Sequence, residues 1–293
     1  MIVRPLTGRA LKFPLPRGAV DTQMHMYLPG FPALPGGPPL PGGTLPDAAQ
    51  YRQFMSWFGI ERVIITQGNA HQRDNANLVA CLAEMGSVAR GVAVIDGDTP
   101  DGELDTLSAA GVIGARIMDL PGGAVGLDAL EAIDARASIR GWMVAVQFDG
   151  SNILEHETRL AKLKSRWVLD HHGKFFSGVT PDSPQIAAVK RLIDGGNCWF
   201  KFAGVYESSK SGAPDYSDVA AVARAVAAYA PDRIVWGSNW PHNLAKTTED
   251  YPDDAALADT VLGWLPDDNA RRLALVDNPE QLYGLAPFQG QGD

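Results

Sequence analysis

The sequence predicts a single-domain (β/α)8 barrel of the TIM type that spans residues 1–293. Eight short apolar segments occur in order along the chain, most of them are continuously apolar, and helix-like segments separate them. Continuous apolar segments are typical of parallel strands that are covered on both faces. Repeated strand–helix alternation favours a closed barrel. An open, doubly wound sheet is the alternative, because a count of strands does not establish closure.

The expected strands are rich in Val, Ile, Trp and Phe. In order they lie at residues 18–26, 62–68, 91–96, 114–120, 142–150, 166–173, 198–204 and 233–240. Expected helices between them include residues 74–86, 126–141, 154–165, 183–196 and 216–230. The last of these has Asp218 at its start, an alanine-rich amphipathic body, and Pro231 as a stop signal. No GxGxxG motif follows a strand and opens a helix, which argues against a dinucleotide site.

Composition limits the classes of function. With 293 residues, of which 45% are hydrophobic, the chain can bury a large core. A net charge of −9 argues against a nucleic-acid surface. No apolar segment reaches the roughly 20 residues of a membrane helix, and no signal peptide is recognisable at the N-terminus. Cys81 and Cys198 lack CxxC spacing and imply no disulfide framework. These features predict a cytoplasmic enzyme that acts on a small molecule, with its oligomeric state open.

A Pro/Gly-rich segment at residues 28–46 follows the first expected strand. It could be a disordered surface loop. In a barrel, however, it would lie on the catalytic face, where long loops often cover the site. We therefore expect an active-site loop.

Polar residues gather at the ends of the expected strands, where barrel enzymes carry their catalytic groups. In the first strand, Asp21, Gln23 and His25 are expected to share one face, because strand side chains alternate. The later strands end in Thr66, Gln67 and Asn69; Arg116; Gln147 and Asp149; Asp170, His171 and His172; Lys201 and Tyr206; and Ser238, Asn239 and His242. Four of the six histidines fall at these ends. Such convergence favours an active site over isolated structural histidines.

Several of these residues have structural alternatives. Arg116 could form an ion pair inside the barrel with Asp119 or another carboxylate, or it could bind a substrate carboxylate through its planar guanidinium. Lys201 could bind substrate or balance the charge of Asp170. Gln67 and Gln147 could cap buried backbone groups or bind substrate hydroxyls. His172 is expected to point away from His171, because neighbours on a strand face opposite sides.

Four segments resemble motifs of the amidohydrolase superfamily, in particular its amidohydrolase-2 branch of lactonases and decarboxylases. VDTQMHMY (20–27) is similar to the Asp-x-His-x-His start of that branch, and VLDHHG (168–173) is similar to its Asp-His-x-Gly strand. VWGSNWPH (235–242) resembles its Trp-Gly-Ser/Thr-Asp-Trp-Pro-His strand, and LVDNPEQLYGL (275–285) its closing Asn-Pro-x-x-Leu-Tyr-Gly. The resemblance implies a barrel with its site at the strand ends.

Two positions depart from the family pattern. Gln23 stands where the first ligand histidine is expected, and Asn239 stands in place of an aspartate. A catalytic metal site uses about three imidazole, carboxylate or thiolate ligands, and here only His25 and His171 remain. We therefore expect no metal and no other cofactor. In the family, the aspartate would take a proton from the attacking water, which a neutral amide cannot usefully do.

A substrate that carries its own nucleophile avoids the need for that aspartate. In a sugar-diacid lactone, a hydroxyl can attack the lactone carbonyl and exchange one ring for another, and tethering can replace about 7–11 kcal/mol of activation. The resemblance and the substitutions together predict metal-independent lactone isomerisation. The expected catalytic residues are His171, His25 and Asn239. The expected substrate-binding residues are Gln23, Gln67, Arg116, Gln147, Lys201, Tyr206 and His242.

Three other functions stay open. A metal-independent lactonase would use a histidine to activate water. A metal-dependent hydrolase or decarboxylase would need unusual ligands. A pseudoenzyme would bind a sugar acid without chemistry.

Overall fold

Eight parallel strands form one sheet in sequence order in the computed structural model, which describes residues 2–289. The strands are β1 (Val20–Met24), β2 (Arg62–Thr66), β3 (Ala89–Ala93), β4 (Val112–Asp119), β5 (Met143–Phe148), β6 (Trp167–Leu169), β7 (Cys198–Phe202) and β8 (Ile234–Trp236). Each lies within or overlaps an expected strand. The strand–helix order predicted from the sequence is therefore confirmed.

The sheet closes between β8 and β1, which excludes the open-sheet alternative. The hydroxyl of Thr22 donates to the carbonyl of Trp236 at 2.8 Å, and Met24 forms a parallel bridge with Trp240. Gly237 permits this approach, because a Cβ at that position would lie 2.4 Å from the Cβ of Gln23. The fold is a (β/α)8 barrel.

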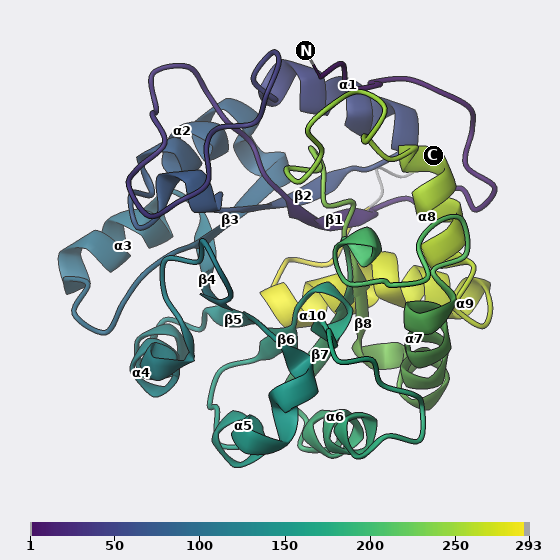
Figure 1. Ribbon diagram of the computed structural model, residues 1–293. Coiled ribbons are helices and arrows are strands. Elements are labelled where there is room, and N and C mark those ends of the chain that lie inside the picture. Colours follow the sequence, from purple (N-terminus) through teal and green to yellow (C-terminus); the bar gives the residue numbers. More distant parts are fainter. Residues whose placement is uncertain (1, 290–293) are drawn as a thin grey trace.

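Most of the helices surround the barrel, and the last one lies across one of its ends (Figure 1). They are α1 (Ala48–Phe58), α2 (Ala76–Met85), α3 (Asp101–Ala109), α4 (Leu130–Ile139), α5 (Ile153–Leu160), α6 (Pro184–Asp194), α7 (Ser217–Tyr229), α8 (Asp254–Leu262), α9 (Asp268–Arg272) and α10 (Asn278–Tyr283). Local signals fix several boundaries: Asp47 caps the start of α1 by accepting from the amide of Gln50, and Gly59 ends it in the left-handed conformation. No helix among the described residues is long and apolar enough to span a membrane.

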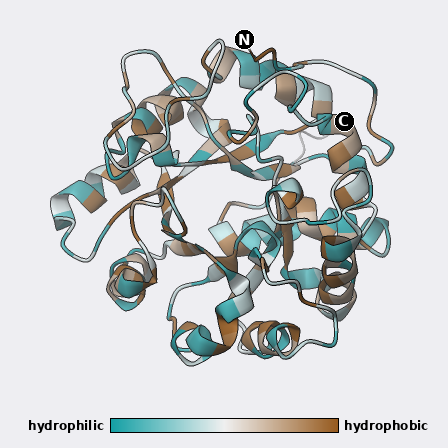
Figure 2. Cartoon of the chain, viewed as in Figure 1, coloured by the Kyte–Doolittle hydropathy of each residue, from teal (hydrophilic) through white to brown (hydrophobic). Residues whose placement is uncertain are grey.

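The core has two parts. One lies between the strands and the surrounding helices, where the brown hydrophobic residues in Figure 2 gather on the strands and inner helix sides. The other fills the inside of the barrel with one or two side chains from each strand, and Leu282 and Tyr283 of α10 pack against them. The inside is therefore solid at the α10 end, and this leaves the opposite end for a site.

The Pro/Gly-rich segment at residues 28–46, which was expected to cover the open end of the barrel, is held by Arg4 near the N-terminus. The guanidinium of Arg4 donates to the carbonyls of Thr44 at 2.8 Å and Gly42 at 2.9 Å. Further along the same segment, the amide of Leu34 donates to the carbonyl of Ala70 at 2.7 Å. The Pro/Gly-rich segment is thus an ordered loop over the carboxyl ends of the strands.

Candidate active site

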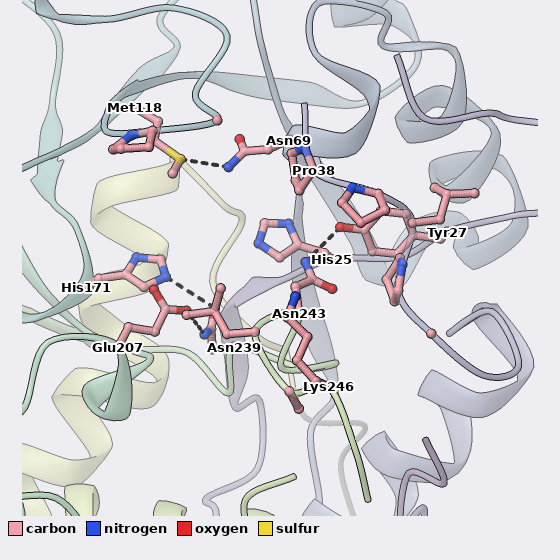
Figure 3. Close-up of a pocket in the computed structure, with 18 of the residues that line it drawn as sticks. His25, Tyr27, Pro38, Asn69, Met118, His171, Glu207, Asn239, Asn243 and Lys246 are labelled. Atoms are coloured by element: carbon pink, nitrogen blue, oxygen red, sulfur yellow. Dashed lines mark hydrogen bonds between the residues drawn. The ribbon is translucent and has the colours of Figure 1, made fainter. Parts of the chain in front are cut away.

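A cavity of about 400 Å³ opens at the carboxyl ends of the strands. Figure 3 shows His171, Glu207 and Asn239 grouped at one side of it and Tyr27 with Asn243 at the other, with His25 between them. Residues 38–42 of the Pro/Gly-rich loop and residues 243–246 after β8 form part of its wall. Among the predicted site residues, those that line the cavity are His25, Arg116, Gln147, His171 and Asn239.

His25 lies just after β1 and presents a proton-accepting nitrogen. Its Nδ1 lies 2.9 Å from the backbone carbonyl oxygen of Thr66. A carbonyl only accepts, so Nδ1 carries a proton and Nε2 holds the free electron pair when the ring is neutral. Burial, followed by the nearby charge of Arg116, lowers the pKa of His25 to about 3. The ring is therefore neutral near pH 7.

His171 begins a short 3-10 turn after β6, in the left-handed backbone region with φ of 50°. Its Nδ1 lies 3.1 Å from Oδ1 of Asp170, and its Nε2 lies 3.2 Å from Oδ1 of Asn239. Both ring nitrogens thus face oxygen atoms, which accept protons. The ring is placed as a hydrogen-bond donor, in contrast with His25.

Asn239 is held by residues of the loop after β7. Its Nδ2 donates to Oε1 of Glu207 and to the hydroxyl of Tyr206, both at 2.8 Å. Lys174 forms an ion pair with the other carboxylate oxygen of Glu207. Burial alone would raise the pKa of Glu207, but His171 and Lys174 lower it to about 2. Glu207 is therefore an ionised carboxylate in the cavity wall.

Sequence reasoning missed Glu207. It lies five residues beyond the end of β7, and a single acidic residue in a loop carries no pattern. Its only signal was its place directly after Tyr206, near a strand end.

Tyr206 and His242 support the cavity without lining it. The Tyr206 hydroxyl lies 2.7 Å from Nδ1 of His242, and Nε2 of His242 lies 2.7 Å from Oδ1 of Asp254. Burial and then the charge of Glu207 raise the pKa of Tyr206, which keeps its phenol protonated. The two residues therefore link Asn239 to the start of α8 rather than forming the cavity wall.

Arg116 is held by three uncharged oxygens. Its guanidinium donates to the carbonyl of Gln67, to Oδ1 of Asn69 and to Oε1 of Gln147, each at 2.9 Å. No carboxylate of the described residues lies within ion-pair distance of it, so the expected alternative of a pair with Asp119 does not hold. A buried cation without a paired anion at the cavity wall suits a carbonyl or carboxylate oxygen.

Gln67 and Gln147 have different positions. The side chain of Gln67 donates to the backbone carbonyl of Asp74 at 2.6 Å and does not line the cavity. Its placement matches the structural alternative, whereas Gln147 lies in the cavity wall and orients Arg116.

Gln23 and Lys201 lie beneath the cavity. The ammonium of Lys201 donates to Oε1 of Gln23 at 2.9 Å and lies 3.2 Å from Oδ1 of Asp170. Burial opposes both charges, but the pair holds the pKa of Asp170 well below its usual range and raises that of Lys201. Neither Gln23 nor Lys201 lines the cavity, and Lys201 balances Asp170, which was the structural alternative for it.

Asp21 does not share a face with Gln23 and His25, and that expectation was wrong. Its carboxylate accepts from the hydroxyl of Tyr51 in α1 at 2.8 Å and from the amide of Ser238 at 2.9 Å. The pairing register of β1 with β2 shifts between Asp21 and Met24. Such an irregularity interrupts strict alternation, so Asp21 faces the helix while Gln23 faces the barrel.

His172 points away from the cavity, as expected. Its ring stacks on Phe202 at 4.9 Å between centroids and packs against Trp264 at 5.6 Å. Neither ring nitrogen has a hydrogen-bond partner among the described residues. Burial and the neighbouring His171 lower its pKa to about 3.

The donor set does not fit a catalytic metal. Within residues 2–289, no group of three or more His, Cys, Asp or Glu side chains is arranged to hold a metal ion. His25 leaves Nε2 free, as a metal ligand would, but both ring nitrogens of His171 face protein oxygens, and the two altered positions carry neutral amides. Gln23 instead binds the Lys201 ammonium, a cation that would repel a metal.

Comparisons with known proteins agree with this architecture. A model of an amidohydrolase family matches residues 19–285. D-galactarolactone isomerase of Agrobacterium fabrum is 62% identical over 288 residues, which cover 98% of each chain. A 2-pyrone-4,6-dicarboxylate hydrolase of Comamonas testosteroni is 31% identical, with 93% of this chain and 92% of the relative covered. An apo crystal structure of an Agrobacterium tumefaciens protein superposes with a TM-score of 0.95 at 62% identity, covering 97% of this chain and 100% of that one.

Proposed function

The chain belongs to the amidohydrolase family, and we propose that it isomerises a lactone of a sugar diacid, D-galactaro-1,5-lactone to D-galactaro-1,4-lactone, by intramolecular acyl transfer. The observation that carries this proposal is the pairing of His171 with an amide, Asn239, at the position where the family has an aspartate. The relative that is 62% identical, named D-galactarolactone isomerase, supports the choice of substrate.

Arg116 would bind the lactone carbonyl. Its guanidinium is buried and already oriented by Gln147 and Asn69. As the hydroxyl attacks, negative charge develops on the carbonyl oxygen, and a fixed cation stabilises it without reorganisation.

His25 and His171 would exchange protons with the substrate in opposite directions. The hydroxyl on C4 attacks the carbonyl carbon C1, and its proton passes to Nε2 of His25. The bond between C1 and the ring oxygen on C5 breaks, and that oxygen takes the proton from Nε2 of His171, whose ring is left neutral with its remaining proton on Nδ1 toward Oδ1 of Asp170. One C–O bond forms, one breaks, and no water is consumed. The two histidines recover their starting protonation by exchange with solvent after product release.

No metal is needed for this reaction. Arg116 supplies the positive charge that a metal would provide at the carbonyl, and the substrate supplies the nucleophile. We propose a metal-independent enzyme, in keeping with the amide side chains at positions 23 and 239.

Lactone hydrolysis is the second candidate, and one observation favours it. Glu207 is an ionised carboxylate in the cavity wall and could accept a proton from water. However, both of its oxygens are already bound, to Asn239 and to Lys174. This engagement disfavours it as a base.

The test is to incubate the EDTA-treated protein with fresh galactaro-1,5-lactone in ¹⁸O water and to follow the products by NMR and mass spectrometry. Unlabelled 1,4-lactone, formed faster than in a protein-free control, is the expected product. Labelled open diacid would mean that the protein is a lactonase. Tight binding without turnover would mean a pseudoenzyme.

A further inference from the structure

The amide of Asn239 has a fixed orientation, because its neighbours can only accept hydrogen bonds from it. A carboxylate has no proton to donate, so the NH₂ end of Asn239 must face Glu207. The Tyr206 hydroxyl accepts from the same NH₂ group and is free to give its own proton to Nδ1 of His242. His242 in turn donates through Nε2 to Asp254. The direct hydrogen bond to Glu207 and the series through Tyr206 and His242 to Asp254 therefore require the same orientation of the Asn239 amide.

The consequence appears at His171. With its NH₂ end toward Glu207, Asn239 presents only its oxygen to Nε2 of His171, at 3.2 Å. An oxygen without a proton requires a donor, so Nε2 carries the proton. If the amide were turned, an NH₂ group would face Nε2, and Nε2 could not keep its proton; the proton of the ring would then lie on Nδ1, which faces Oδ1 of Asp170 at 3.1 Å.

We infer that Glu207 is a positioning residue that holds the acidic proton of His171 on Nε2 by fixing the amide of Asn239. This inference rests on the proposed function for the use of that proton, which is to protonate the leaving ring oxygen. Glu207 acts through Asn239 and is not itself the base.

Lys174 fixes the position and the charge of the Glu207 carboxylate. The Lys174 ammonium, buried in the turn after β6, binds the second carboxylate oxygen. One oxygen is thus committed to a cation and the other to the amide, which leaves the carboxylate no alternative arrangement. The ion pair also keeps the carboxylate ionised, since a protonated Glu207 could donate to Asn239 and reverse the amide.

Glu207→Gln tests the inference. The Lys174 ammonium attracts the amide oxygen of the new side chain and turns its NH₂ group toward Asn239. Two NH₂ groups cannot face each other, so the Asn239 amide turns, and the Tyr206 hydroxyl can rotate to donate to its oxygen. We expect kcat to fall by roughly 10²-fold, in the range of lost acid–base catalysis, with a much smaller change in KM.

The decisive measurement is whether Nε2 of His171 carries a proton in the free enzyme, read by long-range ¹H–¹⁵N NMR of histidine-labelled protein. The signal is assigned with His171→Asn. We expect a protonated Nε2 in the natural protein and an Nε2 without a proton, with Nδ1 protonated, in Glu207→Gln. Because no substrate is present, this result does not depend on whether the proposed reaction is correct.

Lys174→Met/Glu207→Gln is the matched control. Without the ammonium, the glutamine oxygen can turn toward Asn239 and restore the original orientation. We expect the Nε2 signal and most of the lost kcat to return. A protonated Nε2 of His171 in Glu207→Gln, whatever happens to activity, would overturn the inference, and so would a double variant whose Nε2 stays without a proton.

Discussion

The side-chain oxygen of Gln23 accepts a hydrogen bond of 2.9 Å from the ammonium of Lys201. At this position a histidine would present a lone pair to a metal, but the glutamine presents its oxygen to a protein cation. Lys201 is itself balanced by Asp170, 3.2 Å away. The glutamine therefore does more than remove a metal ligand. It forms a buried cluster with Lys201 and Asp170, and the ammonium in this cluster would repel a metal cation.

The first prediction concerns metal removal. Dialysis against EDTA should leave the isomerase rate unchanged, and added Zn²⁺ or Mn²⁺ should not increase it, because the donor set near His25 and His171 does not fit a catalytic metal. The measurement is the rate before and after chelation, with the metal content of the same samples determined by mass spectrometry. A rate that falls with metal content and recovers on its return would contradict the prediction.

The second prediction concerns the pair Asn239 and Glu207, whose side chains lie 2.8 Å apart. In Asn239→Asp, two carboxylates would share this space, and such a pair retains one proton near neutral pH. In Asn239→Asp/Glu207→Gln, the glutamine can donate to the new aspartate, which is then free to ionise and to accept a proton from water. We expect the double variant to hydrolyse the lactone at pH 7 faster than either single variant.

Incorporation of ¹⁸O from water into the open diacid measures this hydrolysis. Asn239→Asp alone should incorporate label mainly at high pH, where the shared proton is lost. If the double variant takes up no more label than the natural protein, the carboxylate at position 239 is not what separates hydrolysis from isomerisation here.

The third prediction is that His171→Asn lowers kcat by roughly 10²- to 10⁴-fold, which is the usual contribution of general acid–base catalysis. Asparagine suits the test because it tolerates the left-handed backbone of this position, where φ is 50°. Circular dichroism should show an unchanged fold. Retained activity would remove His171 from the mechanism.

The fourth prediction is that Arg116→Lys lowers kcat/KM by about 10- to 100-fold. A lysine cannot reproduce the three hydrogen bonds from a planar guanidinium to Gln67, Asn69 and Gln147, and each bond to a charged group contributes about 1.5–3 kcal/mol. Steady-state kinetics measures the loss, and urea unfolding separates it from a change in stability. Kinetics equal to those of the natural protein would show that the guanidinium does not contact the substrate.

The rule that barrel enzymes carry their catalytic groups at strand ends locates much of this cavity from sequence alone. His25, Arg116, Gln147, His171 and Asn239 all line it, because parallel strands bring their carboxyl ends together. The rule fails where a loop decides the direction of a side chain. Gln67 turns to the carbonyl of Asp74, a partner that only the folded loop supplies.

Two further differences have local physical causes. Asp21 faces α1 because the register of β1 shifts, and nothing in a short apolar segment indicates such an irregularity. Glu207 lies at the cavity in the turn after β7, where Lys174 binds its carboxylate. Ion pairs between separate loops depend on tertiary structure, so no local sequence pattern predicts them.

The fifth prediction concerns His172 and the pH dependence of stability. In the unfolded chain a histidine gains a proton near pH 6.5, whereas buried His172 gains one only near pH 3. Between these values the unfolded state binds more protons, so stability falls as the pH decreases. At pH 5 the free energy of unfolding is lower by about 2 kcal/mol because of His172. His25, whose pKa is also lowered to about 3, contributes a further decrease.

His172→Phe should therefore flatten this dependence. The ring lies among Phe202, Phe200 and Trp264, with no hydrogen-bond partner among the described residues, so phenylalanine fits the surroundings chemically. The left-handed backbone at this position, with φ of 54°, opposes the change by an amount that does not depend on pH. The free energy of unfolding in urea, measured at pH 7.5 and pH 5, should decrease by about 2 kcal/mol less in the variant. The activity control is kcat near pH 7.5, which should stay close to that of the natural protein because this ring lies outside the cavity. Equal decreases in the free energy of unfolding of the two proteins would mean that His172 titrates normally in the folded state.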